Sequence, residues 1–202
     1  MLKPKLAILI PTIDGREHYF DKLYRKIAEQ KMWFPDNDVV IIFQKDQGHL
    51  NGGMSIGEKR NHLIDYAVKS EATHRAFIDD DDDISDNYLQ LNMPGVYGNY
   101  DCNSLVGIIT TNGVKDPNKH IFFHSLKYDK WWEDSQYYYR NPNHLNVVSL
   151  EKTKDIRFPF INDGEDGQFS LELARRNCLH NEYEITEPFY YYLFRSKGLD
   201  GL

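Results

Sequence analysis

Five consecutive aspartates, Asp79 to Asp83, directly follow a short and mainly apolar segment at residues 75–78. Neighbouring carboxylates about 4 Å apart repel each other by roughly 1 kcal/mol in water, and by several times more near a protein surface. Because residues 75–78 predict a strand, the first aspartates are expected to be fixed at its end. Side chains alternate along a strand, so Asp79, Asp81 and Asp83 are expected to share one face. Hard oxygen ligands fixed in this way suit Mg²⁺ or Mn²⁺, and the alternative is an acidic turn in water.

Two further apolar runs, at residues 6–10 and 39–43, are typical of strands buried on both faces. Apolar residues recur at helical spacing after each of these runs, and the strand before the aspartates comes third. This order predicts a mainly parallel sheet with right-handed crossovers, in which ligands bind at the carboxyl ends of the strands. Thr12, Gln44 and Asp79 stand at these ends, so we expect them on one rim of the sheet.

The C-terminal half of the chain has a different pattern. We predict a helix at residues 164–177, and strands at 105–109, 120–124, 145–150 and 189–194. The polar and aromatic stretch at 128–143 predicts a long ordered loop. We therefore expect the 202 residues to form a single α/β domain, with helices flanking a mainly parallel central sheet and a small antiparallel portion in the C-terminal half.

The composition limits where the protein works and what it binds. Hydrophobic residues make up 41% of the chain and charged residues 27%, which indicates a packed core. The 24 Lys and Arg against 31 Asp and Glu give a net charge of −7, which argues against nucleic acid as a partner. We find neither a transmembrane-length apolar run nor the apolar core of a signal peptide, and the two cysteines lack disulfide or zinc-site spacing. A cytoplasmic location is expected, in the host cytoplasm if the protein is viral.

Two common sites for cations and phosphates do not match the sequence. A calcium-binding EF-hand loop that starts at Asp79 requires Gly at its sixth position and Glu at its twelfth, where the chain has Ile84 and Gln90. A pair of glycines with the spacing of a phosphate-binding loop is followed by Glu58, where that loop needs Lys. If a nucleotide binds, its diphosphate is therefore expected to be neutralised by a metal ion on the aspartates.

A second acidic pair, Glu165 and Asp166, lies at the start of the helix predicted at residues 164–177. Carboxylates at such a position ordinarily cap the helix or interact with its dipole. Together with the aspartate run, these two carboxylates also suit catalysis of group transfer. Group transfer from a nucleotide to a hydroxyl needs a metal ion for the leaving diphosphate and a carboxylate that accepts the proton of the acceptor.

With these motifs together, the chain resembles a small family 2-type glycosyltransferase of the GT-A (Rossmann-like) fold, similar to short viral and bacterial members. The resemblance spans about residues 6–175 and rests on five segments: 6–12, 57–61, 77–82 with the DxD motif, 143–146, and 164–166 with the ED motif. It implies an enzyme that moves a sugar from a UDP- or GDP-sugar to a glycan or another hydroxyl compound, with inversion and with Mn²⁺ or Mg²⁺ as cofactor. It also implies a nucleotide-binding half, 1–92, and an acceptor and catalytic half, 93–202.

The resemblance assigns roles to individual residues. Asp166 corresponds to the general base, with Glu165 beside it. The residues expected to contact the nucleotide sugar are Thr12, Arg16, Gln44, Arg60, Asn61, Asp79 and Asp80. The residues expected to hold the metal ion are Asp79, Asp81 and His144, although the aspartate run leaves their register open by one residue and His144 has a structural alternative as a buried histidine. Gln44 replaces an acidic group that often reads the base, and Asp46 is an alternative for that task.

Other functions and roles stay open at this point. A metal-dependent nucleotidyltransferase also uses paired aspartates and would release pyrophosphate instead of a nucleoside diphosphate. A non-catalytic domain that binds a divalent metal would use Glu165 and Asp166 only as a helix cap. The aromatic residues Trp131, Trp132 and 137–139 are expected either to stack on an acceptor sugar or to pack under the loop.

Overall fold

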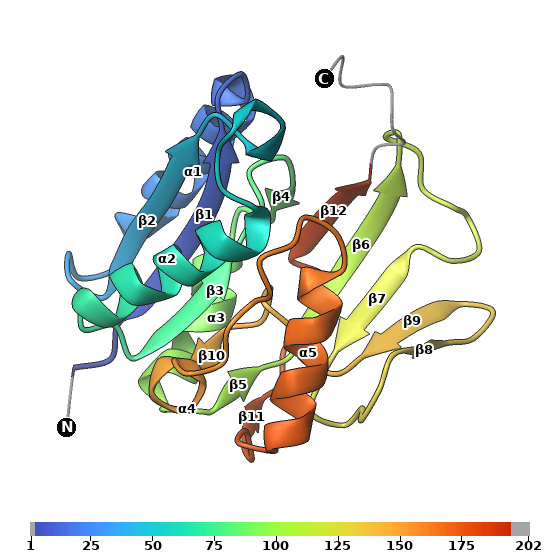
Figure 1. Ribbon diagram of the computed structural model, residues 1–202. Coiled ribbons are helices and arrows are strands. Elements are labelled where there is room, and N and C mark those ends of the chain that lie inside the picture. The colour runs from blue at the N-terminus through green and yellow to red at the C-terminus, as the bar shows by residue number, and fades with distance from the viewer. Residues whose placement is uncertain (1–2, 195–202) are drawn as a thin grey trace.

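The computed structural model describes residues 3–194, which form two six-stranded sheets side by side (Figure 1). The first sheet has the strand order β11-β5-β10-β3-β1-β2. Its strands are β1 (Leu6–Ile13), β2 (Val39–Asp46), β3 (His74–Phe77), β5 (Cys102–Asn103), β10 (Val148–Ser149) and β11 (Glu182–Tyr183). Strand β1 pairs in parallel with both β2 and β3, as the sequence predicts.

The second sheet has the order β4-β12-β6-β7-β9-β8 and mixed strand directions. Its strands are β4 (Asp83–Ile84), β6 (Leu105–Thr111), β7 (Ile121–His124), β8 (Trp132–Glu133), β9 (Tyr137–Arg140) and β12 (Tyr190–Phe194). The α/β class with a mainly parallel first sheet is confirmed. The predicted small antiparallel portion belongs to a complete second sheet, in which parallel and antiparallel pairs are mixed.

Helices cover both faces of the first sheet, which gives three layers (Figure 1). The helices are α1 (Glu17–Lys31), α2 (Ile56–Lys69), α3 (Tyr88–Tyr97), α4 (Leu150–Thr153) and α5 (Glu165–Arg176), and a 3₁₀ turn, η1, spans His49–Asn51. Alternate residues of β1 belong to two separate cores. Ile8 packs with residues of α1 and α3, whereas Leu9 packs with residues of α2 and α5. The apolar run of β1 is therefore buried on both faces.

Three segments differ from what the sequence predicts. The predicted loop at 128–143 contains the β8–β9 hairpin, because residues 137–140 pair with β7. The predicted strand at 145–150 is reduced to β10, because α4 already begins at Leu150. Helix α3 is not predicted at all: it contains Pro94, and apolar residues surround most of its circumference.

Within residues 3–194, no helix has the length and apolar character needed to span a bilayer.

Gly57 and Gly167 each lie in the first turn of a helix, but only Gly57 is closely surrounded by other atoms. Substitution of both therefore tests how tightly the start of α2 is packed. A Cβ on Gly57 of α2 would meet the carbonyl oxygen of Pro159 at 1.8 Å, whereas a Cβ on Gly167 of α5 would meet nothing within 4 Å. We expect Gly57→Ala to lower the free energy of unfolding by about 1–3 kcal/mol. Gly167→Ala should raise it by up to about 1 kcal/mol, because Ala favours the helix over Gly. Urea unfolding of both variants measures the difference, and equal effects would contradict the close contact.

Candidate functional site

The aspartate run alternates between buried and half-buried residues that have partners, and is not a turn in water. Asp80, which is 3% exposed, accepts a hydrogen bond from Thr12 Oγ1 at 2.6 Å and one from Arg16 Nη1 at 3.0 Å. Arg16 Nη1 also lies 3.3 Å from the carboxylate of Asp81. Three of the residues expected to bind the nucleotide, Thr12, Arg16 and Asp80, therefore meet at the carboxyl end of β1.

The later aspartates join the two sheets. Asp82 accepts hydrogen bonds from the Tyr190 hydroxyl at 2.7 Å and from the Leu193 amide at 2.9 Å, and both partners belong to β12. Burial and the nearby charge of Asp79 raise the pKa of Asp82 well above its usual range. Asp83 forms ion pairs with two lysines of α1. The alternation predicted from a strand fails here, because the strand ends at Phe77 and the neighbouring Asp80 and Asp81 both contact Arg16.

Arg60 of α2 connects the two acidic motifs. Its guanidinium donates to both carboxylate oxygens of Asp79, at 2.8 and 3.1 Å, and forms a short ion pair with Glu165. The side chain is buried between the rings of Phe77 and Phe158, whose centroids lie 5.9 and 5.5 Å from the guanidinium carbon. Glu165 is itself only 6% exposed. The first aspartate of the DxD motif and the glutamate of the ED motif thus share one buried cation.

His144 lies beside Asp79 because the chain there runs along the end of β3. The Phe77 amide donates to the His144 carbonyl at 3.0 Å, which places the imidazole Nε2 3.7 Å from Asp79 Oδ2. Burial and the charge of Arg60 lower the pKa of His144, so the ring is neutral at pH 7. Burial opposes ionisation of Asp79, but Arg60 and His144 outweigh it and hold the pKa of Asp79 below its usual range. Asp79 is therefore an anion next to a neutral imidazole.

The donor chemistry of this corner fits a divalent cation. Neither ring nitrogen of the buried His144 has a hydrogen-bond partner among residues 3–194, and a neutral imidazole beside a carboxylate is a usual pair of metal ligands. Asp81, the third predicted ligand, is placed near Arg16 instead. The described part of the chain holds no group of three or more His, Cys, Asp or Glu side chains arranged to hold a metal ion. Two of the three predicted ligands are therefore adjacent.

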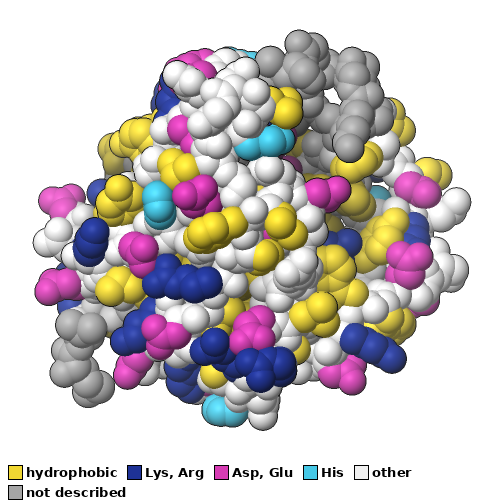
Figure 2. All heavy atoms as spheres, in the orientation of Figure 1, with side chains coloured by type: hydrophobic (Ala, Val, Ile, Leu, Met, Phe, Trp, Pro, Cys, Tyr) yellow, Lys and Arg dark blue, Asp and Glu magenta, His cyan; other side chains and the backbone are white. Residues whose placement is uncertain are grey.

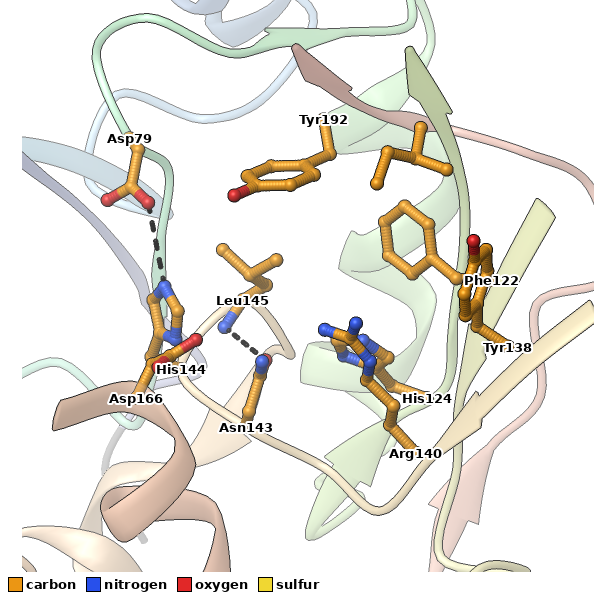
Figure 3. A pocket seen from close by; sticks show the side chains of 11 residues that line it. Asp79, Phe122, His124, Tyr138, Arg140, Asn143, His144, Leu145, Asp166 and Tyr192 are labelled. Atoms are coloured by element: carbon orange, nitrogen blue, oxygen red, sulfur yellow. Dashed lines mark hydrogen bonds and ion pairs between the residues drawn. The ribbon is translucent and has the colours of Figure 1, made fainter. Parts of the chain in front are cut away.

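A pocket lies between the rim of the first sheet and the second sheet (Figure 3). Asp79 and His144 line one wall, and Asp166 from the first turn of α5 lines the floor beside His144. The opposite wall comes from the second sheet and consists of Ile109, Phe122, His124, Tyr138, Arg140 and Tyr192, while Asn143 and Leu145 complete the lining. The pocket therefore brings together a DxD residue, the second ED residue and His144, which are far apart in the sequence.

Of the residues that the second sheet contributes to this pocket, the sequence singles out only Tyr138, as one of the aromatic residues expected either to stack on an acceptor or to pack under the loop. Arg140 and Tyr192 are among the polar residues of this wall, and the Tyr192 hydroxyl points into the space in front of Asp79 (Figure 3). Burial lowers the pKa of Arg140 and raises that of Tyr192 to about 12. The sequence predicts three strands of this wall, at 105–109, 120–124 and 189–194, but no local pattern shows that they lie opposite Asp79. Asn143 and Leu145 lie in a segment that the resemblance already includes.

Another hollow lies next to Thr12, between α1 and β2. Phe43 and Lys45 of β2 line it, and Gln44 between them does not. Asp46 accepts hydrogen bonds from Lys59 and from two backbone amides of the loop that follows β2. The structure therefore gives Asp46 a task in shaping this loop, and base recognition by Gln44 stays a prediction.

Asn61 is the predicted nucleotide-binding residue that the structure places elsewhere. Its buried amide donates to the Phe158 carbonyl and accepts from the Phe158 amide, both at 2.9 Å. These bonds fix Phe158 against Arg60. Asn61 therefore supports the site by holding the ring that covers the guanidinium, and contact with a nucleotide stays a prediction.

Comparisons with known proteins show what the fold is similar to. No family model matches the sequence, and no curated protein matches it. Among solved structures, S. aureus TarS 1-349 in complex with UDP-GlcNAc is similar over 98% of this chain and 60% of that chain, with a TM-score of 0.61 and 15% identity. A longer S. aureus TarS chain is similar over 94% of this chain and 36% of that one, with a TM-score of 0.63 and 17% identity. The protein thus spans less than two thirds of either TarS chain, and the likeness at this identity shows a shared fold.

Replacement of Arg60 tests its role as the shared cation. We expect Arg60→Met to lower the free energy of unfolding by about 3–5 kcal/mol, because two carboxylates lose their buried partner. Arg60→Met combined with Glu165→Gln should recover part of this loss. Arg175→Met is the control, because Arg175 is 71% exposed and its ion pair with Glu172 is worth less than about 1 kcal/mol. Urea unfolding measures all three, and equal effects of Arg60→Met and Arg175→Met would contradict the role.

Proposed function

We propose that the protein is a metal-dependent glycosyltransferase that moves a sugar from a nucleotide diphosphate sugar to an acceptor hydroxyl. The observation that carries this proposal is the pocket that Asp79, His144 and Asp166 share between the two sheets. The fold likeness to TarS, which has structures in complex with UDP-GlcNAc and with UDP, supports it and makes a UDP-sugar the first donor to test. Residues 1–92 would bind the donor, and residues 93–202 would bind the acceptor and supply the base.

The donor is proposed to lie along the rim of the first sheet, from the hollow beside Thr12 to the pocket at Asp79. The nucleoside would enter the hollow, and Phe43 and Lys45 would flank the base. The diphosphate would then lie near Arg16 and the rim aspartates, where a guanidinium can bind two phosphate oxygens at once. This path ends with the sugar in the pocket.

Asp166 is proposed as the general base for a single displacement. Its carboxylate would take the proton of the acceptor hydroxyl while the acceptor oxygen forms a bond to the anomeric carbon. The bond from that carbon to the diphosphate oxygen breaks in the same step, so the anomeric centre inverts. The buried pair of Glu165 and Arg60 would hold the start of α5, and with it Asp166, in place.

A divalent cation, Mn²⁺ or Mg²⁺, would be held by Asp79, His144 and Asp81. When bound, it would neutralise the negative charge of the departing diphosphate. The guanidinium groups of Arg16 and Arg60 would also interact with the negative charge of the diphosphate.

A thermal-shift panel of nucleotide sugars, with and without Mn²⁺, tests the proposal directly. A donor that binds only the folded state at one hundred times its dissociation constant should stabilise the protein by about 2.7 kcal/mol. Turnover of that donor should release a nucleoside diphosphate. Release of pyrophosphate would instead indicate a nucleotidyltransferase, and metal binding without any donor shift would indicate a non-catalytic domain.

Asp166→Asn should reduce transfer by at least a hundredfold and leave donor binding within about twofold, because the amide keeps the shape of the side chain but cannot accept the proton. Asp163→Asn is the matched control, since Asp163 is exposed just before the same helix and should keep full turnover. Transfer is followed by release of the nucleoside diphosphate, and donor binding by calorimetry. A variant that retains most of the turnover would remove the assignment of Asp166 as base.

Asp81→Ala should weaken Mn²⁺ binding at least tenfold and should abolish the Mn²⁺-dependent part of donor binding. Asp86→Ala is the control, because the Asp86 side chain is 96% exposed. Removal of the metal with a chelator should stop transfer in the unmodified protein, and added Mn²⁺ should restore it. Calorimetric titration with Mn²⁺ measures the affinities, and an unchanged affinity in Asp81→Ala would exclude Asp81 as a ligand.

A further inference from the structure

A second hollow, here called the α5 hollow, lies toward the carboxyl end of α5. Its lining includes Tyr128, Asp129, Asn141, Leu173, Ala174 and His180. Asp166 stands in the first turn of the same helix, so the α5 hollow begins about 10 Å further along the helix axis at 1.5 Å per residue. The sequence analysis and the proposed function assign nothing to the α5 hollow.

The indole ring of Trp131 contacts one residue of the pocket wall and one residue of α5. Its Nε1 donates to Ser170 Oγ of α5 at 3.2 Å, and the Arg140 guanidinium lies 4.3 Å from the ring centroid. Arg140 lines the pocket, and Ser170 lies between Asp166 and the residues of α5 that line the α5 hollow. Trp131 remains 40% exposed, so it presents an aromatic surface on the path between the two sites.

Hydrogen bonds to α5 hold the segment at residues 141–142 in place before any ligand binds. Asn141 Nδ2 donates to the Ser170 carbonyl at 2.9 Å, and Ser170 Oγ donates to the Pro142 carbonyl at 3.0 Å. The segment that joins the pocket to the α5 hollow is therefore tied to the helix that carries Asp166. A surface held in this way loses little conformational entropy when it binds a partner.

The side chains along this path have the chemistry that binds sugars. Tyr128 lies at the α5 hollow, and its ring contacts Tyr139 at 5.2 Å, which in turn stacks on Trp132 at 4.0 Å. Aromatic faces pack on the apolar face of a pyranose ring, while carboxylate, amide and imidazole groups bind its hydroxyls. Asp129, Asn141 and His180 supply these polar groups at the α5 hollow. Figure 2 shows hydrophobic surface beside α5, bordered by charged side chains.

We propose that the path from the pocket past Trp131 to the α5 hollow is a binding track for an oligosaccharide acceptor. The sugar unit that receives the new residue lies at Asp166, and the units that precede it lie on Trp131 and in the α5 hollow. This inference rests on the proposed function and names its acceptor class: a chain of several sugar units, in preference to a free monosaccharide. A track of this length makes the affinity depend on the length of the acceptor.

The test is binding of the full chain to an immobilised panel of defined oligosaccharides, from monosaccharides to hexasaccharides, in the presence of UDP and Mn²⁺. Two variants probe the track. Trp131→Ala removes the aromatic surface, and Ala174→Trp fills the α5 hollow from an exposed position of α5 that does not disturb the core. Trp33→Ala is the matched control, because Trp33 is 79% exposed at the end of α1.

We expect the unmodified protein to retain tetrasaccharides and longer chains of one series and to retain monosaccharides at least tenfold more weakly. Trp131→Ala and Ala174→Trp should each weaken retention of the long chains at least tenfold, and Trp33→Ala should leave it within twofold. Equal retention of short and long chains, unchanged retention in both track variants, or no retained glycan would each overturn the track. A UDP-sugar thermal shift is measured in parallel: its absence counts against the proposed function, whereas its presence with a failed glycan test counts against the track alone.

Discussion

The buried guanidinium of Arg60 is the interaction on which the site depends. It pairs with Asp79 just after β3 and with Glu165 at the start of α5, so it joins two elements that are far apart in the sequence. A buried carboxylate without a partner costs several kcal/mol, so neither motif is stable in its position without this cation. Asp166 follows Glu165 directly, and its position in the pocket is a consequence of this pairing.

The aspartate run also explains why two sheets meet at this point. Asp82 accepts hydrogen bonds from two residues of β12, and β4 begins with Asp83 and pairs with the same strand. The run thus ends one sheet and starts the other. Because the pocket lies at this junction, its two walls come from different sheets, and the polar groups of the rim face the tyrosines and the arginine of the second sheet.

The sequence predicts the parts of the structure that depend on local pattern. The apolar runs identify β1, β2 and β3. The charged motifs after β3 and at the start of α5 identify Asp79, Glu165 and Asp166, which the structure gathers around Arg60 and the pocket. The sequence does not predict a strand that forms only because a segment elsewhere in the chain pairs with it. The tyrosines at 137–139 have no apolar alternation, and they form a strand because β7 lies beside them. Arg140 and Tyr192 enter the pocket through this second sheet. Tyr192 lies in a strand that the sequence predicts, but no local pattern shows that either side chain reaches the pocket.

The charge balance of the rim gives an independent reason to expect a metal ion with the donor. Arg16 is paired with Asp80, and Lys59 with Asp46, while Arg60 is shared between two carboxylates. The cations that a diphosphate would meet are therefore already neutralised by the protein, and the chain as a whole carries a net charge of −7. A diphosphate brought to this rim adds negative charge next to the anionic Asp79, which is unfavourable in a partly buried site. A divalent cation bound with the diphosphate removes that repulsion, so donor and metal should bind together more tightly than either alone.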